Sequence, residues 1–523
     1  MTVLKLPEIE QSPDKIKIVC DNNVHIELTS IPVRYYRHGW QSWSLAAWTD
    51  LTPLPIQYPK IMHPLQMDPV YAFETRPHGS WLGAVEFEDG NILLLGALGL
   101  DAHVTLNGNQ LLGQYDAEDG EWFIAHGHES AVFEVYANLL ANRFGKAQKN
   151  AAPRVWCSWY SLYTAIDEPI LHKIFDQLDD LPFDVLQVDD GWEKKVGDWE
   201  TNKKFPAGMT ALADKIKSTG RKAGLWLAPL VAVRSSQLFR EHADWFLRND
   251  KGRFVSAGFN WGEHLYGLDT THPEVLNWLA NLIKRVRAWG FDYLKLDFLY
   301  AGGLPGKRYS DIPREAAYRN GLKVIREAMG EDAFLLTCGA PIIPSIGLCD
   351  AIRVGPDVAR GWENRRDAVL LSNPAIPGTK NAIRTSINML WLNHLVQTDP
   401  DVVYFSTKKN SLKPEQRRLL QDLALVCKFK ATSELPQWLT KEDKEQLRAF
   451  LEDVTEVKPM GRYKFQIGHR DVDFSHVIGL PHPPRGFEII LAKLTGWLGS
   501  HPMILRTVNR LGNRLFERMK NEL

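Results

Sequence analysis

Two similar stretches, PFDVLQVDDGW at residues 182–192 and GFDYLKLDFLY at residues 290–300, decide how this chain folds. Each carries an Asp at the start of a short apolar run and a second Asp five residues later. Such a run is typical of a buried parallel strand, along which five residues cover about 17 Å. The two Asp residues of each stretch therefore belong to opposite ends of one strand.

Short apolar runs alternate with longer amphipathic segments between residues 151 and 428. The clearest amphipathic segment is PEVLNWLANLIKRVRAWG at residues 273–290, where apolar residues recur at helical spacing. Thr271 suits the N-cap of this helix, and Gly290 suits its end. Strands alternating with helices over this length predict a (β/α)₈ TIM barrel. A doubly wound sheet is the alternative, but no GxGxxG follows any of the apolar runs.

The barrel is expected to have a domain on either side. Residues 1–150 predict an N-terminal antiparallel β-sandwich, with the strand-like runs KIKIVC, VHIEL, NILLLGAL, AHVTLN and SAVFEVYANL separated by turn signals. Residues 429–523 form a small C-terminal region that ends in an amphipathic basic helix at 502–523. We expect this helix to pack on its own domain or on a second subunit, with a membrane surface as the less favoured alternative.

Composition narrows the classes of partner and the compartment. The formal net charge is -1, which fits a neutral substrate better than nucleic acid or an acidic membrane. The five cysteines are scattered without metal-site or disulfide spacing. The first residues contain no apolar secretory segment, and no apolar run is long enough to span a bilayer. A cytoplasmic protein without metal or cofactor is the expectation.

Charged side chains gather where the predicted barrel strands end. They are Asp189, Asp190, Lys295, Asp297, Arg353 and Asp357. Active sites of TIM barrels lie at the carboxyl ends of the strands, and a pair of carboxyl groups suits glycoside hydrolysis. Metal-assisted hydrolysis is an alternative, but no predicted barrel strand ends in His. Serine-nucleophile chemistry lacks a GxSxG elbow, and a non-catalytic sugar-binding protein is the alternative of another class.

Several motifs in this order and spacing resemble glycoside hydrolase family 36. They are HGWQSWS, WCSWYSLYTAIDE, QVDDGW, GLWLAP, YLKLDF, TCGAP and RVGPD, between about residues 35 and 405. The resemblance implies a retaining exo-α-galactosidase, with α-galactosyl transfer or α-N-acetylgalactosaminidase activity as alternatives at the same site. The LAPL that follows GLW, where many members carry Glu-Pro-Glu, indicates a shorter branch with a plainer pocket rim.

The resemblance also implies roles for single residues. Asp297, at the end of the fourth strand, matches the nucleophile, and Asp357, after the sixth, matches the general acid/base. Asp189 and Asp190 match residues that bind galactose hydroxyls. The other expected substrate-binding residues are Trp40, Trp192, Trp226, Lys295, Cys338 and Arg353. Trp40, from the sandwich, would lean over the pocket mouth, and the seventh strand would fall near residues 383–393, so that HLYGLD near 269 precedes a helix.

Overall fold

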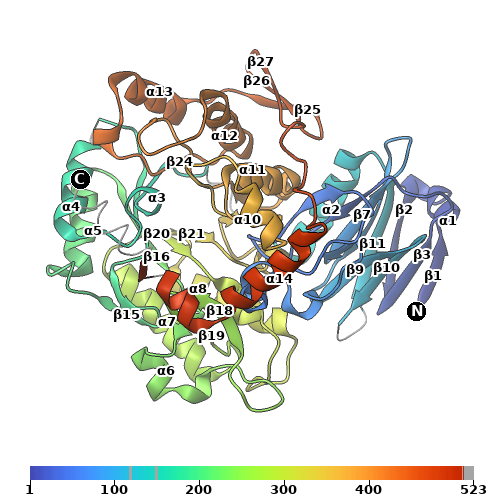
Figure 1. Ribbon diagram of the computed structural model, residues 1–523, viewed down its shortest axis with the longest axis horizontal. Helices are drawn as coiled ribbons and strands as arrows, with labels where there is room; N and C mark the ends of the chain where they lie inside the picture. The colour runs from blue at the N-terminus through green and yellow to red at the C-terminus, as the bar shows by residue number, and fades with distance from the viewer. Residues whose placement is uncertain (117–119, 148–150, 179, 509, 512–523) are drawn as a thin grey trace.

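The structure is a computed structural model of the chain, and it describes residues 1–116, 120–147, 151–178, 180–508 and 510–511. A central barrel lies between an N-terminal sandwich and a C-terminal region (Figure 1). Within this part of the chain, no helix is long and apolar enough to cross a membrane.

Eight parallel strands form the barrel sheet, in the order β23-β22-β21-β20-β16-β13-β12-β24. Their bounds are β12 Val155–Cys157, β13 Val185–Val188, β16 Lys222–Leu227, β20 Tyr293–Leu296, β21 Phe334–Thr337, β22 Ala351–Arg353, β23 Gln397–Asp399 and β24 Ala431–Thr432. A further parallel bridge joins Val403, just after β23, to Thr432 in β24, so the two edges of the sheet meet. The predicted TIM barrel is confirmed, with Asp297 after the fourth strand and Asp357 after the sixth.

Helices pack around this sheet (Figure 1). The longer ones are α4 Glu168–Gln177, α5 Gly208–Ser218, α7 Pro273–Ala288, α8 Arg314–Met329, α11 Thr379–Asn388 and α12 Pro414–Cys427. Shorter ones are α3 Trp159–Leu162, α6 Gln237–Glu241, α9 Ile342–Ser345 and α10 Arg365–Leu370. The helix expected near residue 273 is α7, which buries Val275 and Leu279 as its spacing predicted. Its N-cap is His272 rather than Thr271, because the His272 side chain accepts the N–H of Glu274.

The seventh strand was predicted in the wrong place. Residues 383–393 belong instead to α11 and to a short 3₁₀ segment at Leu390–His394, and the seventh strand is β23. Every residue of α11 except Lys380 is buried, polar residues included, so burial in this segment does not follow residue type. The eighth strand, β24, lies just past residue 428, so the barrel sheet extends to Thr432. The HLYGLD segment lies in β19 (Glu263–Gly267), between β17 (Val231–Val233) and β18 (Ser256–Asn260) in a small antiparallel sheet.

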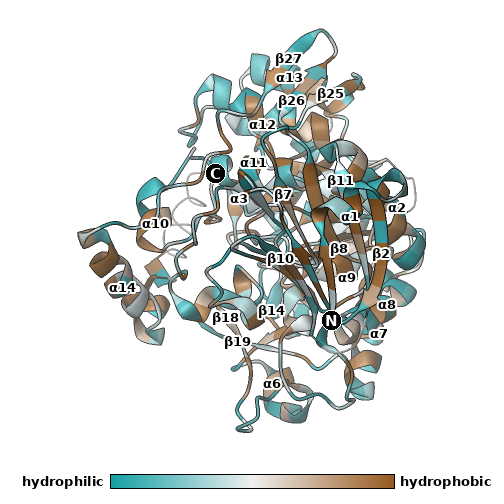
Figure 2. Cartoon of the chain, turned by 90° about the vertical axis from the view of Figure 1, so that its right-hand side faces the viewer, coloured by the Kyte–Doolittle hydropathy of each residue, from teal (hydrophilic) through white to brown (hydrophobic). Residues whose placement is uncertain are grey.

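The N-terminal region forms two packed sheets. The first has the order β1 Thr2–Lys5, β3 Asn23–Glu27, β10 Gln110–Tyr115, β9 Ala102–Asn107 and β6 His78–Ser80. The second has the order β2 Ile16–Asp21, β11 Gly120–Gly127, β8 Ile92–Ala97, β7 Leu82–Glu86, β4 Arg34–Arg37 and β5 Ala47–Thr49. All pairs are antiparallel except β1 with β3. Figure 2 shows β8 as a hydrophobic strand, and all its residues are buried.

One strand expected in the sandwich is a helix. SAVFEVYANL lies in α2 (Glu129–Phe144), which packs on the second sheet. Its buried residues Val132, Phe133, Tyr136 and Leu140 are spaced by three and four, which is a helical period. The Val and Phe content of the segment suggests a strand, but the spacing of the apolar residues decides its structure.

The C-terminal region is mixed. It contains α13 (Lys441–Glu452), an antiparallel sheet of β25 (Val457–Gly461), β26 (Lys464–Ile467) and β27 (Arg470–Asp473), and α14 (Phe487–Gly499). The predicted terminal helix is seen at residues 502–508 and 510–511, with Ile504, Val508 and Leu511 exposed, whereas Leu515 and Met519 lie outside the described residues. Assembly with a second subunit through this helix stays a prediction.

A buried carboxyl group joins the sandwich to the barrel. Glu315, in α8, accepts the indole N–H of Trp40 at 2.8 Å and that of Trp81 at 2.7 Å, and the backbone N–H of Asp101 at 2.6 Å. Its neighbour Arg314 forms an ion pair with Asp68 at 2.6 Å. Burial, and then the charge of Asp101, raise the pKa of Glu315 to about 8. The contact therefore holds the HGWQSWS segment against the barrel.

Replacing Glu315 with Ala should destabilise the protein by about 3 kcal/mol, because it leaves the buried N–H groups of Trp40, Trp81 and Asp101 without their acceptor. Urea unfolding followed by tryptophan fluorescence measures this loss. The matched control is Glu327→Ala on the same helix, whose side chain is 64% exposed in a surface pair with Lys323. That change should cost less than about 0.5 kcal/mol. Equal effects of the two substitutions would contradict the assignment.

Candidate active site

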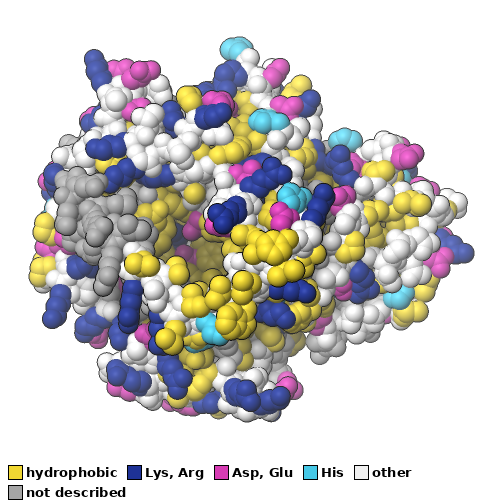
Figure 3. Space-filling view, in the orientation of Figure 1, with side chains coloured by type: hydrophobic (Ala, Val, Ile, Leu, Met, Phe, Trp, Pro, Cys, Tyr) yellow, Lys and Arg dark blue, Asp and Glu magenta, His cyan; other side chains and the backbone are white. Residues whose placement is uncertain are grey.

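A cavity of about 260 Å³ opens at the carboxyl ends of the barrel strands. Figure 3 shows the hollow on this face of the molecule. The candidate residues that line it are Asp189, Asp190, Trp226, Lys295, Asp297 and Asp357. The structure therefore brings both proposed catalytic carboxyl groups to one cavity, as expected for the active-site end of a TIM barrel.

Asp297 directly follows β20, and two donors hold its carboxyl group. The Trp226 indole donates to one oxygen at 3.0 Å, and the Phe298 backbone N–H donates to the other at 2.9 Å. Phe298 has a φ of 55°, a left-handed conformation in which its own N–H points back to the Asp297 side chain. Each oxygen of Asp297 therefore has a fixed orientation at the cavity wall.

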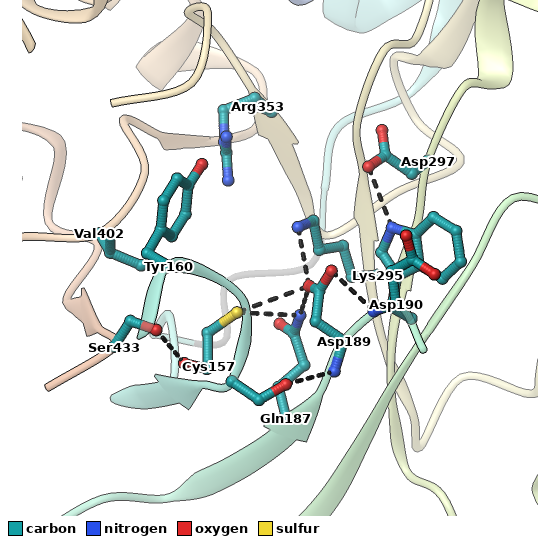
Figure 4. Close-up of polar contacts among 12 residues, drawn as sticks. Cys157, Tyr160, Gln187, Asp189, Asp190, Lys295, Asp297, Arg353, Val402 and Ser433 are labelled. Atoms are coloured by element: carbon teal, nitrogen blue, oxygen red, sulfur yellow. Dashed lines mark hydrogen bonds and ion pairs between the residues drawn. The ribbon is translucent and has the colours of Figure 1, made fainter. Parts of the chain in front are cut away.

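Lys295 and Asp189 form a buried ion pair, with Nζ and Oδ2 3.0 Å apart (Figure 4). Gln187 also donates to Asp189 Oδ2, at 2.6 Å. Burial opposes the charge of the lysine, but Asp189 together with Asp297 and other neighbours outweighs it, and the pKa of Lys295 lies well above its usual value. Lys295, an expected substrate-binding residue, lies two residues before Asp297 in the chain. Its direct partner is instead Asp189, on the strand β13 side of the site.

Asp190 presents one paired and one unpaired oxygen. The Trp261 indole donates to its Oδ2 at 2.8 Å. Its Oδ1 is buried and has no hydrogen-bond partner among the described residues. Burial, with the nearby charge of Glu193, raises the pKa of Asp190 well above its usual value. The carboxyl group of Asp190 lines the cavity, and its raised pKa favours the protonated form, which both donates and accepts hydrogen bonds.

Asp357 is half-buried, with 40% of its side chain exposed where it borders the cavity. Its Oδ1 accepts a hydrogen bond from Arg353 Nη1 at 3.2 Å. Burial raises the pKa of Asp357, and the charge of Asp297 adds to the rise while Arg353 and Lys295 oppose it. Asp357 is therefore the carboxyl group of the pair whose surroundings favour holding a proton.

Arg353 does not reach the cavity, although it was expected to hold a ring hydroxyl. Its guanidinium is 4% exposed and is bound on three sides by carboxylates. Nε contacts Asp399 at 2.9 Å, Nη2 contacts Asp401 at 2.9 Å, and Nη1 contacts Asp357. Its closest partners are protein carboxylates, because a buried guanidinium without them would be strongly disfavoured.

Three other expected binding residues also lie behind the cavity wall. Trp192 is fully buried and donates to the Trp226 carbonyl oxygen at 3.0 Å. Cys338, after β21, is 1% exposed. Trp40 is bound to Glu315, so it cannot lean over the pocket mouth. From the same segment, Trp43 lines the cavity instead.

Further aromatic side chains complete the wall. Trp261 and Trp43 each pack against Phe298, with ring centroids 4.9 and 5.1 Å apart. Trp159, which directly follows β12 and Ser158, also lines the cavity. Trp261 comes from the small antiparallel sheet between β16 and α7, and no motif marks it. Trp43 lies inside HGWQSWS, so the sequence pointed to the right segment, but to Trp40 rather than Trp43.

No group of three or more His, Cys, Asp or Glu side chains in the described part of the chain is arranged to hold a metal ion. The carboxylates of the site are paired with Lys295, Arg353 and indole N–H groups. The site contains two carboxyl groups with different surroundings, beside hydrogen-bonding and aromatic groups. This combination suits the binding and hydrolysis of a sugar.

Comparisons with known proteins support this interpretation. The pattern of the Melibiase family matches residues 127–326. The curated α-galactosidase 1 of Pediococcus pentosaceus is 26% identical over 199 residues, which make up 35% of this chain and 27% of that protein. The matched stretch thus spans about a quarter of the length of this curated relative.

Solved structures match over much more of the chain. The α-galactosidase TtGalA of Thermus thermophilus, in complex with p-nitrophenyl α-D-galactopyranoside, is 44% identical, with a TM-score of 0.84. The match covers 89% of this chain and 95% of that one. The family 36 α-galactosidase AgaA of Geobacillus stearothermophilus shares the fold at 15% identity, with a TM-score of 0.57 and coverage of 82% and 61%. This chain belongs to glycoside hydrolase family 36, the α-galactosidase family that its motifs resemble.

Proposed function

We propose that this protein is a retaining exo-α-galactosidase that removes terminal α-linked galactose from oligosaccharides. The observation that carries the proposal is the pair Asp297 and Asp357. Both line one cavity, but their surroundings differ. Two N–H donors orient the carboxylate of Asp297, while burial favours the protonated form of Asp357. A nucleophile and a general acid need this difference.

The reaction proceeds in two displacements. Asp297 attacks the anomeric carbon as Asp357 donates its proton to the leaving glycosidic oxygen, which gives a galactosyl-enzyme. Asp357, now a carboxylate, takes a proton from water, and the resulting attack on the anomeric carbon releases galactose and Asp297. Two inversions at the same carbon retain the anomeric configuration.

The walls of the cavity suit a single terminal sugar. Asp190, Asp189 and Lys295 line the cavity and offer polar groups to the hydroxyls of a sugar. Trp226, Trp261 and Phe298 present aromatic surface for the apolar side of the ring. A cavity of about 260 Å³ suits a single terminal sugar residue, which supports exo action.

The solved complexes support the substrate class. TtGalA has been crystallised with p-nitrophenyl α-D-galactopyranoside and with stachyose. The second match is 46% identical, with a TM-score of 0.79, and covers 83% of this chain and 93% of that one.

The five cysteines, Cys20, Cys157, Cys338, Cys349 and Cys427, are free. Free cysteines support a reducing compartment such as the cytoplasm as the site of action.

The direct test is a panel of p-nitrophenyl glycosides. The α-galactoside should be cleaved at least about a hundred-fold faster, in kcat/KM, than the α-glucoside, whose 4-hydroxyl points to the other side of the ring, and than the β-galactoside, whose leaving group lies on the face that Asp297 attacks. The N-acetyl-α-galactosaminide tests the alternative specificity, and product analysis with raffinose at high concentration tests galactosyl transfer. Preference for either alternative would replace the proposed activity, and sugar binding without any release of nitrophenol would indicate a non-catalytic protein.

Replacing Asp297 with Ala should abolish nearly all turnover, because the nucleophile is lost. Added azide should restore part of the activity and give the β-galactosyl azide, since azide enters from the face that Asp297 occupied. The matched control is Asp184→Ala, at the start of β13 and so at the opposite end of the barrel, where Asp184 pairs with Arg154. That variant should keep its activity. An α-galactosyl azide would instead identify Asp357 as the nucleophile.

The raised pKa of Asp357 predicts that activity falls on the alkaline side of the pH profile. Cleavage of a natural oligosaccharide should fall as the pH rises through the pKa of Asp357, because only the protonated form donates to the leaving oxygen. The Asp357→Asn variant should lose this alkaline limb and should retain far more activity on p-nitrophenyl α-galactoside than on raffinose. Profiles of kcat/KM for both substrates measure this. An unchanged limb in Asp357→Asn would assign it to another group.

A further inference from the structure

Arg353 is surrounded by more negative charge than it can neutralise. Asp399, at the end of β23, and Asp401, two residues later, take its Nε and Nη2, each at 2.9 Å. Asp357 takes Nη1 at the longer distance of 3.2 Å. Asp399 and Asp401 are 2% and 0% exposed, whereas Asp357 borders the cavity. The guanidinium is thus held mainly by two buried carboxylates that do not line the cavity.

Asp401 also binds the backbone next to the proposed acid. Its Oδ2 accepts the N–H of Val358, the residue after Asp357, at 3.0 Å. The Tyr160 hydroxyl, from α3, donates to the same oxygen, and Val402 donates to Oδ1 at 2.8 Å. Figure 4 shows Tyr160 and Arg353 on the same side of the site. All these partners are donors and suit the carboxylate form of Asp401, while burial raises the pKa of Asp401 to about 7 and the charge of Arg353 opposes the rise.

The backbone of Asp401 is bent to make these contacts. Its φ is +83°, a conformation that residues other than glycine rarely adopt. The Asp401 N–H donates to Asp399 Oδ1 at 2.8 Å, which holds the bend. Strained backbone persists where surrounding bonds enforce it, and it is concentrated at functional sites.

We propose that Asp401 is a positioning residue for the acid/base carboxyl group. By binding both Arg353 and the Val358 amide, it fixes Asp357 at the cavity wall and reduces the share of the Arg353 charge that reaches Asp357. This inference rests on the proposed function, and it assigns to Asp401 an effect on proton donation rather than a contact with the sugar.

The other charged and titratable groups around Asp357 are known from the same structure. They are Lys295, Asp297, Arg353, Tyr160, Tyr163, Cys338 and Asp401. Lys295 is itself paired with Asp189 at 3.0 Å. Arg353 is therefore the cation in direct contact with Asp357, and its carboxylate partners control how strongly it acts.

The Asp401→Asn substitution tests the proposal. It keeps the shape of the side chain but removes one negative charge, so Arg353 should act more strongly on Asp357 and lower its pKa. The alkaline limb of kcat/KM should move to lower pH by roughly one unit. Above that limb, activity on raffinose should fall about ten-fold more than activity on p-nitrophenyl α-galactoside, because nitrophenolate leaves without a proton donor.

The matched control is Asp350→Asn, at the opposite end of β22. Asp350 pairs with Arg326 and accepts the N–H of Leu335 at 2.7 Å, so its loss also breaks a buried aspartate–arginine pair. Its pH profile and its ratio of activities on the two substrates should match those of the unaltered protein. If Asp401→Asn does not fold by circular dichroism, Asp399→Asn removes the same charge from Arg353 and should move the limb in the same direction.

Two results would overturn the inference alone. One is an active Asp401→Asn protein, or Asp399→Asn in its place, whose alkaline limb coincides with that of the unaltered protein. The other is an equal loss on raffinose and on p-nitrophenyl α-galactoside, which a merely structural role would give. Absence of α-galactosidase activity in the unaltered protein would overturn the proposed function and this inference together, so the two failures are distinguishable.

Discussion

The site depends on how the barrel pairs the charges that it buries at the carboxyl ends of its strands. Burying a cation without a partner is strongly unfavourable, and Lys295 and Arg353 are both almost fully enclosed. Lys295 is paired with Asp189 from another strand, and Arg353 with Asp399 from a third. These pairs hold the carboxyl ends of the strands in register with one another.

The carboxyl groups that are not tied up in these ion pairs are the ones suited to chemistry and binding. Asp297 receives N–H groups rather than a direct cation, Asp357 receives one long contact from Arg353, and Asp190 keeps one oxygen without a partner among the described residues. These three groups all face the cavity. A ligand with several hydroxyl groups would complete the hydrogen bonds that the protein leaves open, and this requirement links the electrostatics of the fold to recognition of a sugar.

Most of the scaffold could be predicted because its signals are local. The spacing of apolar residues in α7 and the runs around Asp189 and Asp297 each lie within one element, and all three were assigned correctly. The seventh strand could not be found, because β23 has only three residues and α11 before it buries polar residues as well as apolar ones. The helix α2 was missed because its residue types favour a strand while their spacing is helical.

The sequence by itself determined which charged residues end the barrel strands, because a strand and the residue after it are set by a few neighbouring amino acids. Only the tertiary structure decided what those residues contact. Arg353 meets Asp399 across 46 positions of sequence, and Trp226 meets Asp297 across 71. Trp40 is turned to Glu315 on a distant helix, which leaves Trp43 for the cavity. Partners so far apart in the chain are chosen by how whole elements pack, and no local pattern records that choice.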